Sequence, residues 1–506
     1  MDRRHFLHMT GGSVAALLSG CGGGGGSSAP PPPPPPGMVS GGVDFAPLAS
    51  RLQGSVVLPA STDYDGLRLL ANTLYDGIKP AAIVRCTTPA DVQAALAFVQ
   101  QNNLAVTARC GGHSWAGYST TTGVVLNVTA MNAVTVNGDG TATVGAGARL
   151  AEVYSGLIAR GVCIPSGTCD TVGIAGITMG GGIGVLDRKF GLTCDTLVSA
   201  DIVTVDGSLR TCSATSEPDL FWAIRGGGGG NFGIATAFTF RTHPTQDITV
   251  AQADFRVQDF AAVFKAWQTW PQSLPDDIWG QVFVNIFQGV ATFTVSAYCL
   301  GTSGYLTPYW NAFLAATGVA SGVSSTVTQR TYQDVALDFC PSGALSQCSL
   351  QGYSPNGGVQ RYAEVLSSDF FASPLPDAGI QALLDNLAAL ANGNGVGSYI
   401  FDHMGGALAR VAPDATAFPH RNALFSLEYA VSRITGFAYD ATWPNAMRGR
   451  MSAWSTGGAY VNYLDPLLTD WQAAYYGSNY ARLQQVKKTY DPHRVLTMAQ
   501  GIVPAS

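Results

Sequence analysis

Charge is scarce in this 506-residue sequence: Asp, Glu, Lys and Arg together make up 12% of the residues, and the formal net charge is −6. No basic stripe runs through the chain, so a nucleic acid is not expected as a partner. Hydrophobic residues make up 46%. Such a composition favours a large folded core over disorder, and the length suggests two large domains.

Several functional patterns are missing as well. The body of the chain has no apolar run of the roughly 18 residues that a membrane-spanning helix needs. No C-x-x-C pair and no His/Cys cluster has zinc spacing, so no metal is expected. No G-x-S-x-G motif occurs, and the seven histidines are scattered along the chain. A serine hydrolase is therefore not supported.

Residues 1–21 have the pattern of an export signal. Arg3 and Arg4 precede a short apolar run at 14–18, as in twin-arginine signals; a chance Arg pair at a cytosolic N-terminus is the alternative. The sequence L-L-S-G-C ending at Cys21 resembles a bacterial lipobox and predicts a lipid on Cys21, with an unmodified Cys as the alternative. Residues 22–42 form a Gly/Pro-rich linker. The protein is therefore expected to be periplasmic or extracytoplasmic, and to meet a membrane only through this anchor.

Strand-like and helix-like pieces alternate from residue 77 to about 245. Residues 81–84, 104–107 and 123–128 predict strands. A helix is expected over 92–101, because Thr88 can cap it, Pro89 suits the first turn and Asp91 complements the helix dipole.

The character of the chain changes at residue 246. Longer apolar strands are expected at 281–287 and 292–298, and a helix at 380–391. Motif-like segments return from about residue 454. We therefore predict a first domain over 43–245 that residues 451–506 complete, with a second domain inserted at 246–450.

Two glycine-rich motifs lie in the first domain. Residues 109–115 read R-C-G-G-H-S-W, and a His after two glycines lets the backbone approach a flat ligand closely; a structural role is the alternative for a solitary His. Residues 165–176 read P-S-G-T-C-D-T-V-G-I-A-G, and G-G-G-I-G follows at 180–184. So many glycines imply tight backbone contacts with a diphosphate or a ring edge.

Three more motifs follow. Residues 219–225 (D-L-F-W-A-I-R) precede five glycines and N-F-G at 231–233. The nominal G-x-G-x-x-G within this stretch is not of the Rossmann type, because a helix-like segment precedes it where that motif needs a strand. The fourth motif is Y-V-N-Y-L-D at 460–465, and the fifth runs from 476 to 492.

Taken in this order, the five motifs closely resemble those of the berberine-bridge-enzyme-like group of FAD-linked oxidases, within the vanillyl-alcohol-oxidase superfamily. The resemblance covers about residues 75–505, although 250–440 carry little of it. It implies an α+β fold: a PCMH-type, two-lobed FAD-binding domain completed by the C-terminus, with an inserted substrate domain of antiparallel sheet backed by helices.

The resemblance to the bicovalent bacterial members implies two bonds to FAD. His113 matches the His that bonds the flavin 8α-methyl carbon, and Cys169 matches the Cys that bonds flavin C6. A neutral imidazole and a thiolate are nucleophiles that suit this chemistry. The alternative for Cys169 is a buried structural Cys. Two linkages imply a raised flavin potential and a pocket open to a bulky substrate.

The family motifs imply further FAD contacts, mostly through backbone N–H groups. These fall at Arg109, Gly111, Gly112, Ser114, Val172, Gly173, Gly176, Gly227, Gly228, Asn231, Ile234, Asn462 and Tyr463. A small residue at the position of Val172 leaves dioxygen a path to the reduced flavin in the family, so Val172 favours an oxidase over a dehydrogenase.

Tyr463 matches the tyrosine that acts as base in several members of the family. A phenol has a pKa near 10 in water, so that pKa must be lowered, or the proton must move together with the hydride. Tyr460 matches a neighbouring pocket tyrosine, and aromatic packing is the alternative for both. Other members use a Glu from the inserted domain, which makes Glu428 the rival base.

The expected reaction is oxidation of a hydroxyl of a carbohydrate or other alcohol, with hydride passing to the flavin and O2 reduced to H2O2. A same-fold dehydrogenase with another electron acceptor is one alternative. An oxidase of a secondary-metabolite alcohol or amine is a second, and a lipid-anchored flavoprotein that binds a ligand without turnover is a third. The sequence indicates neither the exact substrate nor the oligomeric state.

Cysteines and tryptophans complete the expectations. Cys340 and Cys348 lie close together in a Pro/Ser/Gly-rich stretch, which suits a small disulfide loop, and the other pairings cannot be read from sequence. The inserted domain contains four tryptophans whose rings either pack in the core or stack on sugars. They are Trp267, Trp270, Trp279 and Trp310.

Overall fold

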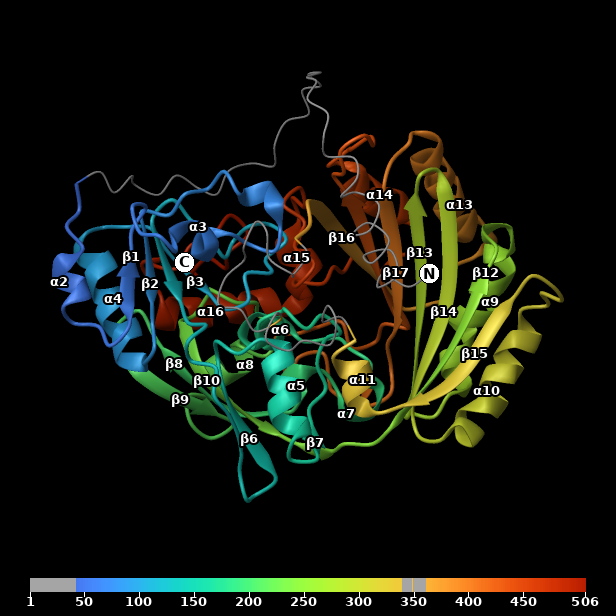
Figure 1. The fold of residues 1–506 in the computed structure, drawn as a ribbon, viewed down its shortest axis with the longest axis horizontal. Coiled ribbons are helices and arrows are strands. Elements are labelled where there is room, and N and C mark those ends of the chain that lie inside the picture. The colour runs from blue at the N-terminus through green and yellow to red at the C-terminus, as the bar shows by residue number, and fades with distance from the viewer. Residues whose placement is uncertain (1–41, 339–347, 349–360) are drawn as a thin grey trace.

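The computed structural model describes residues 42–338, 348 and 361–506, and Figure 1 shows two lobes that meet along the middle of the molecule. The expected export signal, the lipid site at Cys21 and nearly all of the linker lie outside the described residues. Within the described part, no helix is both long and apolar enough to cross a membrane.

The N-terminal part of the first lobe is a four-stranded sheet in the order β1-β2-β4-β3. Its strands are β1 (Ser55–Val57), β2 (Ala82–Arg85), β4 (Val124–Asn127) and β3 (Val106–Arg109). The last three run parallel. Helix α4 (Pro89–Gln101) begins at a capping box in which Thr88 and Asp91 bond each other's backbone N–H groups. The expected strands and helix of this region are thus confirmed to within a few residues.

A five-stranded antiparallel sheet forms the second half of this lobe, in the order β5-β6-β10-β8-β9. Its strands are β5 (Val134–Val136), β6 (Thr141–Gly145), β10 (Ile234–Arg241), β8 (Leu197–Val203) and β9 (Leu209–Ser213). The main helices around it are α5 (Leu150–Ile158), α6 (Ile174–Gly180), α7 (Asp187–Phe190) and α8 (Pro218–Ala223). Since α8 precedes the five glycines of the third motif, a helix rather than a strand leads into them, as expected.

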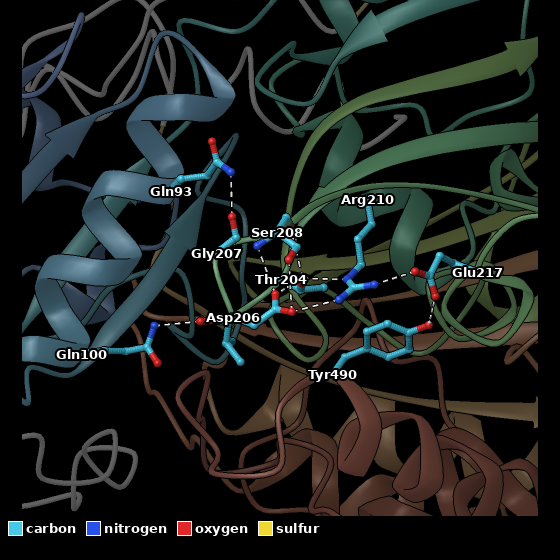
Figure 2. A network of polar contacts seen from close by, with 10 residues as sticks. Gln93, Gln100, Thr204, Asp206, Gly207, Ser208, Arg210, Glu217 and Tyr490 are labelled. Atoms are coloured by element: carbon cyan, nitrogen blue, oxygen red, sulfur yellow. Dashed lines mark hydrogen bonds and ion pairs between the residues drawn. The ribbon is translucent and has the colours of Figure 1, made fainter.

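The C-terminal segment returns to this lobe. Helices α15 (Trp471–Tyr476) and α16 (Tyr480–Tyr490) lie beside its glycine-rich segments, and α16 contacts α8 (Figure 1). Figure 2 shows how Arg210 of β9 joins Asp206 in the β8–β9 turn (2.8 Å) to Glu217 before α8 (2.6 Å), while the Tyr490 hydroxyl at the end of α16 donates to Glu217 (2.5 Å). These contacts fix the end of α16 to the start of α8 and, through Arg210, to the β8–β9 turn.

The second lobe is built on one seven-stranded sheet, in the order β15-β12-β14-β13-β17-β18-β16, in which every pairing is antiparallel. Its strands are β15 (Ser324–Arg330), β12 (Ile248–Phe255), β14 (Val290–Leu300), β13 (Ile278–Phe287), β17 (Gly397–His403), β18 (Phe425–Ser432) and β16 (Glu364–Phe371). Both expected strands fall within β13 and β14.

Helices cover the outer face of this sheet (Figure 1). They are α9 (Phe260–Thr269), α10 (Ser303–Ala316), α13 (Asp377–Asn392) and α14 (Trp443–Met451). The expected helix at 380–391 lies inside α13. Short α11 (Tyr332–Ala336) packs against α5 of the first lobe. The α+β architecture is therefore confirmed, whereas the exact domain boundaries at 245 and 450 stay predictions.

The tryptophans divide between the two faces of the seven-stranded sheet. Trp267, Trp270 and Trp310 pack in the apolar core under the helices, and Trp279 lies on the other face. Cys348 is disulfide-bonded, but Cys340, its expected partner, lies outside the described residues. The other described cysteines form no disulfide: Cys86, Cys110, Cys163, Cys169, Cys194, Cys212 and Cys299.

Candidate active site

A cavity of about 330 Å³ lies where the glycine-rich segments of the first lobe face the seven-stranded sheet. Of the residues expected at the site, all but one line it. These are Arg109, Gly111, Gly112, His113, Ser114, Cys169, Val172, Gly173, Gly176, Gly228, Asn231, Ile234, Glu428, Tyr460, Asn462 and Tyr463. Segments more than 300 residues apart in the chain (109–114 and 460–463) thus meet at one cavity.

Gly227 is the exception: it does not line the cavity, and its expected contact with the cofactor stays a prediction. A Cβ built on Gly227 would meet the carbonyl oxygen of Ala223 at 2.4 Å and a Leu483 methyl at 2.9 Å. The Gly227 carbonyl accepts a hydrogen bond from the Tyr476 hydroxyl at 3.0 Å. Gly227 therefore packs against the helices behind the cavity. Its neighbour Gly228, at φ +80°, takes the position on the wall.

Arg109 lines the cavity, but its charge is used elsewhere. The guanidinium Nε donates to the Ser119 carbonyl at 2.8 Å, and another guanidinium nitrogen donates to the Leu67 carbonyl. The side chain is 4% exposed. The guanidinium therefore holds two backbone segments together. This leaves the backbone of Arg109 for the expected contact with the cofactor.

His113 and Cys169 lie on the same rim of the cavity, although they come from different motifs. The Thr171 hydroxyl is 2.8 Å from Nε2 of His113 and 3.6 Å from Sγ of Cys169. One threonine therefore contacts both nucleophiles. Both side chains are half-buried and line the cavity, so both are accessible to a ligand bound there.

The backbones of these two motifs are in direct contact. A Cβ on Gly111 would meet the Gly173 nitrogen at 2.3 Å, and a Cβ on Gly173 would meet Sγ of Cys110 at 2.2 Å. At Gly176, by contrast, an added Cβ would meet nothing within 4 Å, although this residue lines the cavity. The glycines thus bring backbone to the cavity and leave space beside it. Together with Gly228, they form a wall that fits a flat cofactor such as FAD.

Tyr460 serves as an anchor on the cavity wall, and its expected catalytic role stays a prediction. Its hydroxyl oxygen accepts hydrogen bonds from the backbone N–H groups of Gly182 (2.8 Å) and Ile183 (3.3 Å) and from Nδ2 of Asn462 (2.8 Å). Burial raises the pKa of Tyr460 to about 12. Because burial keeps this hydroxyl protonated, it is a weaker candidate for the base than Tyr463, and its hydrogen bonds position Asn462 and the loop at 182–183.

Tyr463 lies next to this anchor and is only half-buried. Its ring centroid is 5.0 Å from that of Tyr460, at an interplanar angle of 83°. The segment that carries it is fixed at its far end by Asp465, whose carboxylate accepts hydrogen bonds from Ser367 (2.7 Å) and Asn445 (2.8 Å). Tyr463 therefore enters the cavity from a segment held at both ends. Asp465 was not singled out as a site residue, although it closes the Y-V-N-Y-L-D motif.

The opposite wall comes from alternate residues of the seven-stranded sheet. Trp279, Gln281 and Phe283 of β13 line the cavity, because successive side chains of a strand point to opposite faces. Gln281 pairs with Asp402 of β17 across the sheet, and its Nε2 donates to Oδ1 of Asp402 at 2.9 Å. None of these except Trp279 was named from the sequence. The alternation of side chains along β13 could have suggested which residues share a face, but the sequence of the strand does not indicate which face lines the cavity.

Glu428 lies on this same wall. It pairs with Ile400 of β17, is 2% exposed, and lines the cavity. Tyr298 of β14 also lines it, and its ring lies 5.6 Å from that of Trp279. The two candidate bases therefore reach one cavity from opposite sides, Tyr463 from the motif wall and Glu428 from the sheet wall. Among the described residues, no group of three or more His, Cys, Asp or Glu side chains is arranged to hold a metal ion.

Comparisons with known proteins agree with this geometry. A family model described as an FAD binding domain matches residues 80–213, and one described as berberine and berberine like matches residues 459–503. An uncharacterised FAD-linked oxidoreductase of Bacillus subtilis, YgaK, is 33% identical over 468 residues, which cover 90% of this chain and 98% of YgaK.

Oligosaccharide oxidases are also similar. The xylooligosaccharide oxidase of Thermothelomyces thermophilus is 29% identical, over 84% of this chain and 88% of its own. The structure of the Myceliophthora thermophila xylooligosaccharide oxidase with xylobiose superposes with a TM-score of 0.82 at 26% identity, over 91% of this chain and 99% of that one. Glucooligosaccharide oxidase from Acremonium strictum, described with a 6-S-cysteinyl, 8α-N1-histidyl FAD, gives a TM-score of 0.80 at 26% identity, over 91% of this chain and 98% of that one.

Proposed function

Because the chain belongs to the berberine-bridge-enzyme-like family of FAD-linked oxidoreductases, we propose that it oxidises a hydroxyl group of a carbohydrate and passes the electrons to O2, with H2O2 as product. The observation that carries this proposal is the two-walled cavity. One wall holds His113, Cys169 and the glycine backbones, and the other holds polar and aromatic side chains of the sheet.

FAD is proposed to be covalently bound to His113 and Cys169. Bound FAD supplies the hydride acceptor and the route for electrons to leave. Thr171 contacts Nε2 of His113 at 2.8 Å, which fixes the imidazole ring and favours Nδ1 as the bonding nitrogen. The same hydroxyl lies 3.6 Å from Sγ of Cys169. The 6-S-cysteinyl, 8α-N1-histidyl FAD described for glucooligosaccharide oxidase supports this assignment.

Tyr463 is proposed to remove the proton from the substrate hydroxyl. It is half-buried at the cavity and is carried by a segment with Tyr460 and Asp465 at its two ends. A rigid support of this kind keeps a general base within reach of one hydroxyl. Glu428 is the alternative base on the opposite wall.

A carbohydrate is proposed as the substrate because the sheet wall combines aromatic rings with hydrogen-bonding groups. Trp279 and Tyr298 supply apolar surface, and the Gln281–Asp402 pair supplies a donor and acceptor set. Rings and polar groups side by side suit the apolar faces and the hydroxyls of a sugar. The similarity to xylooligosaccharide and glucooligosaccharide oxidases supports this class.

Dioxygen is proposed as the acceptor because Val172, on the cavity wall close to Cys169, is small. It is half-buried, and its backbone N–H donates to the Cys169 carbonyl at 3.1 Å. A dehydrogenase that uses another acceptor is the alternative. The protein is also proposed to be exported and anchored through a lipid on Cys21; a Cys21→Ala variant should then leave the membrane fraction and keep its activity.

The test uses the purified holoenzyme. Without air, an oligosaccharide substrate should bleach the visible absorbance of the flavin. Admission of air should restore the colour and release one H2O2 per substrate oxidised. Bleaching by no member of a sugar panel would contradict the carbohydrate class. Bleaching without reoxidation by air would favour the dehydrogenase.

A further inference from the structure

Helix α16 contains a lysine that is completely buried. Lys487 is 0% exposed, and its ammonium lies 2.6 Å from the carboxylate of Asp491, which is also 0% exposed. The ammonium donates two more hydrogen bonds, to the backbone carbonyls of Asn231 at 2.6 Å and Leu496 at 2.9 Å. All three donors of the lysine are thus used. Neither Lys487 nor Asp491 lines the cavity.

The acceptor of one of these bonds is a cavity residue. Asn231 lines the cavity at the end of the glycine-rich loop that begins at Gly226. Its side-chain Nδ2 donates to the Gly227 carbonyl at 3.1 Å, and its Oδ1 accepts from the Ile502 backbone N–H at 3.0 Å. Two glycines of this loop, Gly228 and Gly230, have φ angles of +80° and +76°. A loop with such a backbone needs external contacts to stay in one conformation.

Those contacts come from the C-terminal segment. Lys487 holds the Asn231 carbonyl, Ile502 holds the Asn231 side chain, and the Tyr476 hydroxyl donates to the Gly227 carbonyl at 3.0 Å. Helix α16 is itself fixed at its end through Tyr490 (Figure 2) and at Arg482, which pairs with Asp219 at 2.7 Å. The glycine-rich loop is therefore held by a helix, α16, that is itself fixed to the first lobe.

Asp491 is equally constrained. Its two carboxylate oxygens accept the backbone N–H groups of Val495 (2.7 Å) and Leu496 (2.9 Å). The carboxylate therefore sets where the Lys487 ammonium lies. A buried ion pair contributes little to stability compared with well-packed apolar residues, but only a donor can bond the Asn231 carbonyl. The ion pair is thus better explained by the hydrogen bond that it directs to the Asn231 carbonyl than by a contribution to the stability of the fold.

We propose that Lys487 and Asp491 are positioning residues of the FAD site: they hold the Asn231 carbonyl, and through it the glycine-rich loop at 226–231, in the conformation that receives the cofactor. The inference rests on the proposed FAD site. It adds that the cofactor wall depends on a buried ion pair outside the cavity.

The first experiment changes the ion pair in the holoenzyme. Lys487→Met keeps the length of the side chain and removes its donors, and Lys487→Met/Asp491→Leu also removes the charge left behind. Lys488→Met, at the exposed neighbouring lysine of the same helix, is the matched control. The measured quantities are flavin per folded chain, the visible flavin spectrum and Tm. Lys487→Met should carry less flavin, with an altered spectrum, and the control should match the wild type.

The double variant separates positioning from stabilisation, and it carries the test if Lys487→Met does not fold. It should regain part of the Tm, because no unpaired charge remains, while its flavin content stays low. The inference is overturned if flavin content returns together with Tm, or if Lys487→Met lowers Tm and leaves flavin content and spectrum unchanged.

A second measurement gives the size of the effect. In a His113→Ala/Cys169→Ala background FAD binding is reversible, so its Kd can be measured by flavin fluorescence. Adding Lys487→Met should weaken binding about 10- to 100-fold, the equivalent of one unsatisfied buried acceptor. An unchanged Kd would overturn the inference. Wild-type protein that carries no flavin at all would instead refute the FAD site itself.

Discussion

The two walls of the cavity are built by different means. On the motif wall, glycines bring the backbone to the cavity, and the side chains proposed to carry the chemistry are those of His113, Cys169 and Tyr463. On the sheet wall, the backbone is committed to strand pairing, and alternate side chains such as Gln281 and Glu428 face the cavity. Substitution of the glycines would change the shape of the motif wall, whereas side chains of the sheet wall can be substituted without a change in strand pairing. Under the proposed function, cofactor chemistry belongs to the first wall and substrate choice to the second.

The largest expected effect is on the motif wall. Tyr463→Phe removes the proposed base and keeps the ring, so the rate of flavin reduction by substrate should fall about 10²- to 10⁴-fold. Flavin content should not change. Stopped-flow reduction without air measures this rate, and Tyr305→Phe, at an exposed tyrosine, is the control.

The same stopped-flow experiment with Glu428→Gln tests whether the catalytic base lies on the sheet wall. If Tyr463 is the base, Glu428→Gln should retain most of the reduction rate. A normal rate of flavin reduction in Tyr463→Phe, together with a large loss of that rate in Glu428→Gln, would show that the base lies on the sheet wall. The proposed division of roles between the two walls would then be wrong.

A smaller effect is expected at Val172. Val172→Leu should narrow the oxygen path, so reoxidation by air should slow about tenfold, which corresponds to about 1.4 kcal/mol in the barrier. Reduction by substrate should stay as in the wild type. Val198→Leu, at an exposed valine, is the matched change. Equal slowing of both half-reactions would mean that Val172 shapes the substrate site and not the oxygen path.

On the sheet wall, Gln281→Leu should raise KM about 5- to 10-fold, because one polar contact of about 1 kcal/mol is lost, and kcat should change little. Steady-state kinetics with the best oligosaccharide measures both constants. The control is Gln381→Leu, which breaks a Gln–Asp hydrogen bond on an exposed helix surface. A loss confined to kcat would show that the sheet wall takes part in the chemistry.

The smallest effect on activity is expected at Asp369 in β16, which carries a pH dependence of stability. Burial raises the pKa of this carboxyl to about 7, while Tyr429 donates to it at 2.9 Å. A raised pKa means that its contribution is complete below pH ~3.8 and is lost as the pH rises through about 7. Asp369→Asn should therefore flatten the Tm profile between pH 4 and 8, measured by thermal unfolding, whereas Asp377→Asn at an exposed position should leave the profile unchanged.

The two walls also differ in how much of them the sequence predicted. His113, Cys169 and most of the glycines could be named, because their positions depend on local motifs. The place of Gly227 outside the cavity lining could not be predicted, because adjacent glycines face opposite ways, one toward Leu483 and one toward the cavity. The surroundings of Tyr460 could not be predicted either, because a motif does not reveal that three donors converge on its hydroxyl.

The sheet wall was mostly missed for another reason. The strands were expected in about the right places, but both faces of β13 are apolar enough to pack, with Trp279 on one side and Val282 on the other. Which face meets the cavity depends on helices α9 and α13 covering the opposite face. Such long-range packing leaves no mark in a single strand.

The central claim is that one flavin joins the two nucleophiles of the motif wall. Precipitation of the purified protein with acid, followed by digestion and mass spectrometry of the yellow peptides, tests it most directly. The account predicts a yellow pellet and a single flavin that links the peptide of His113 to the peptide of Cys169. A colourless pellet from folded, active protein would contradict it.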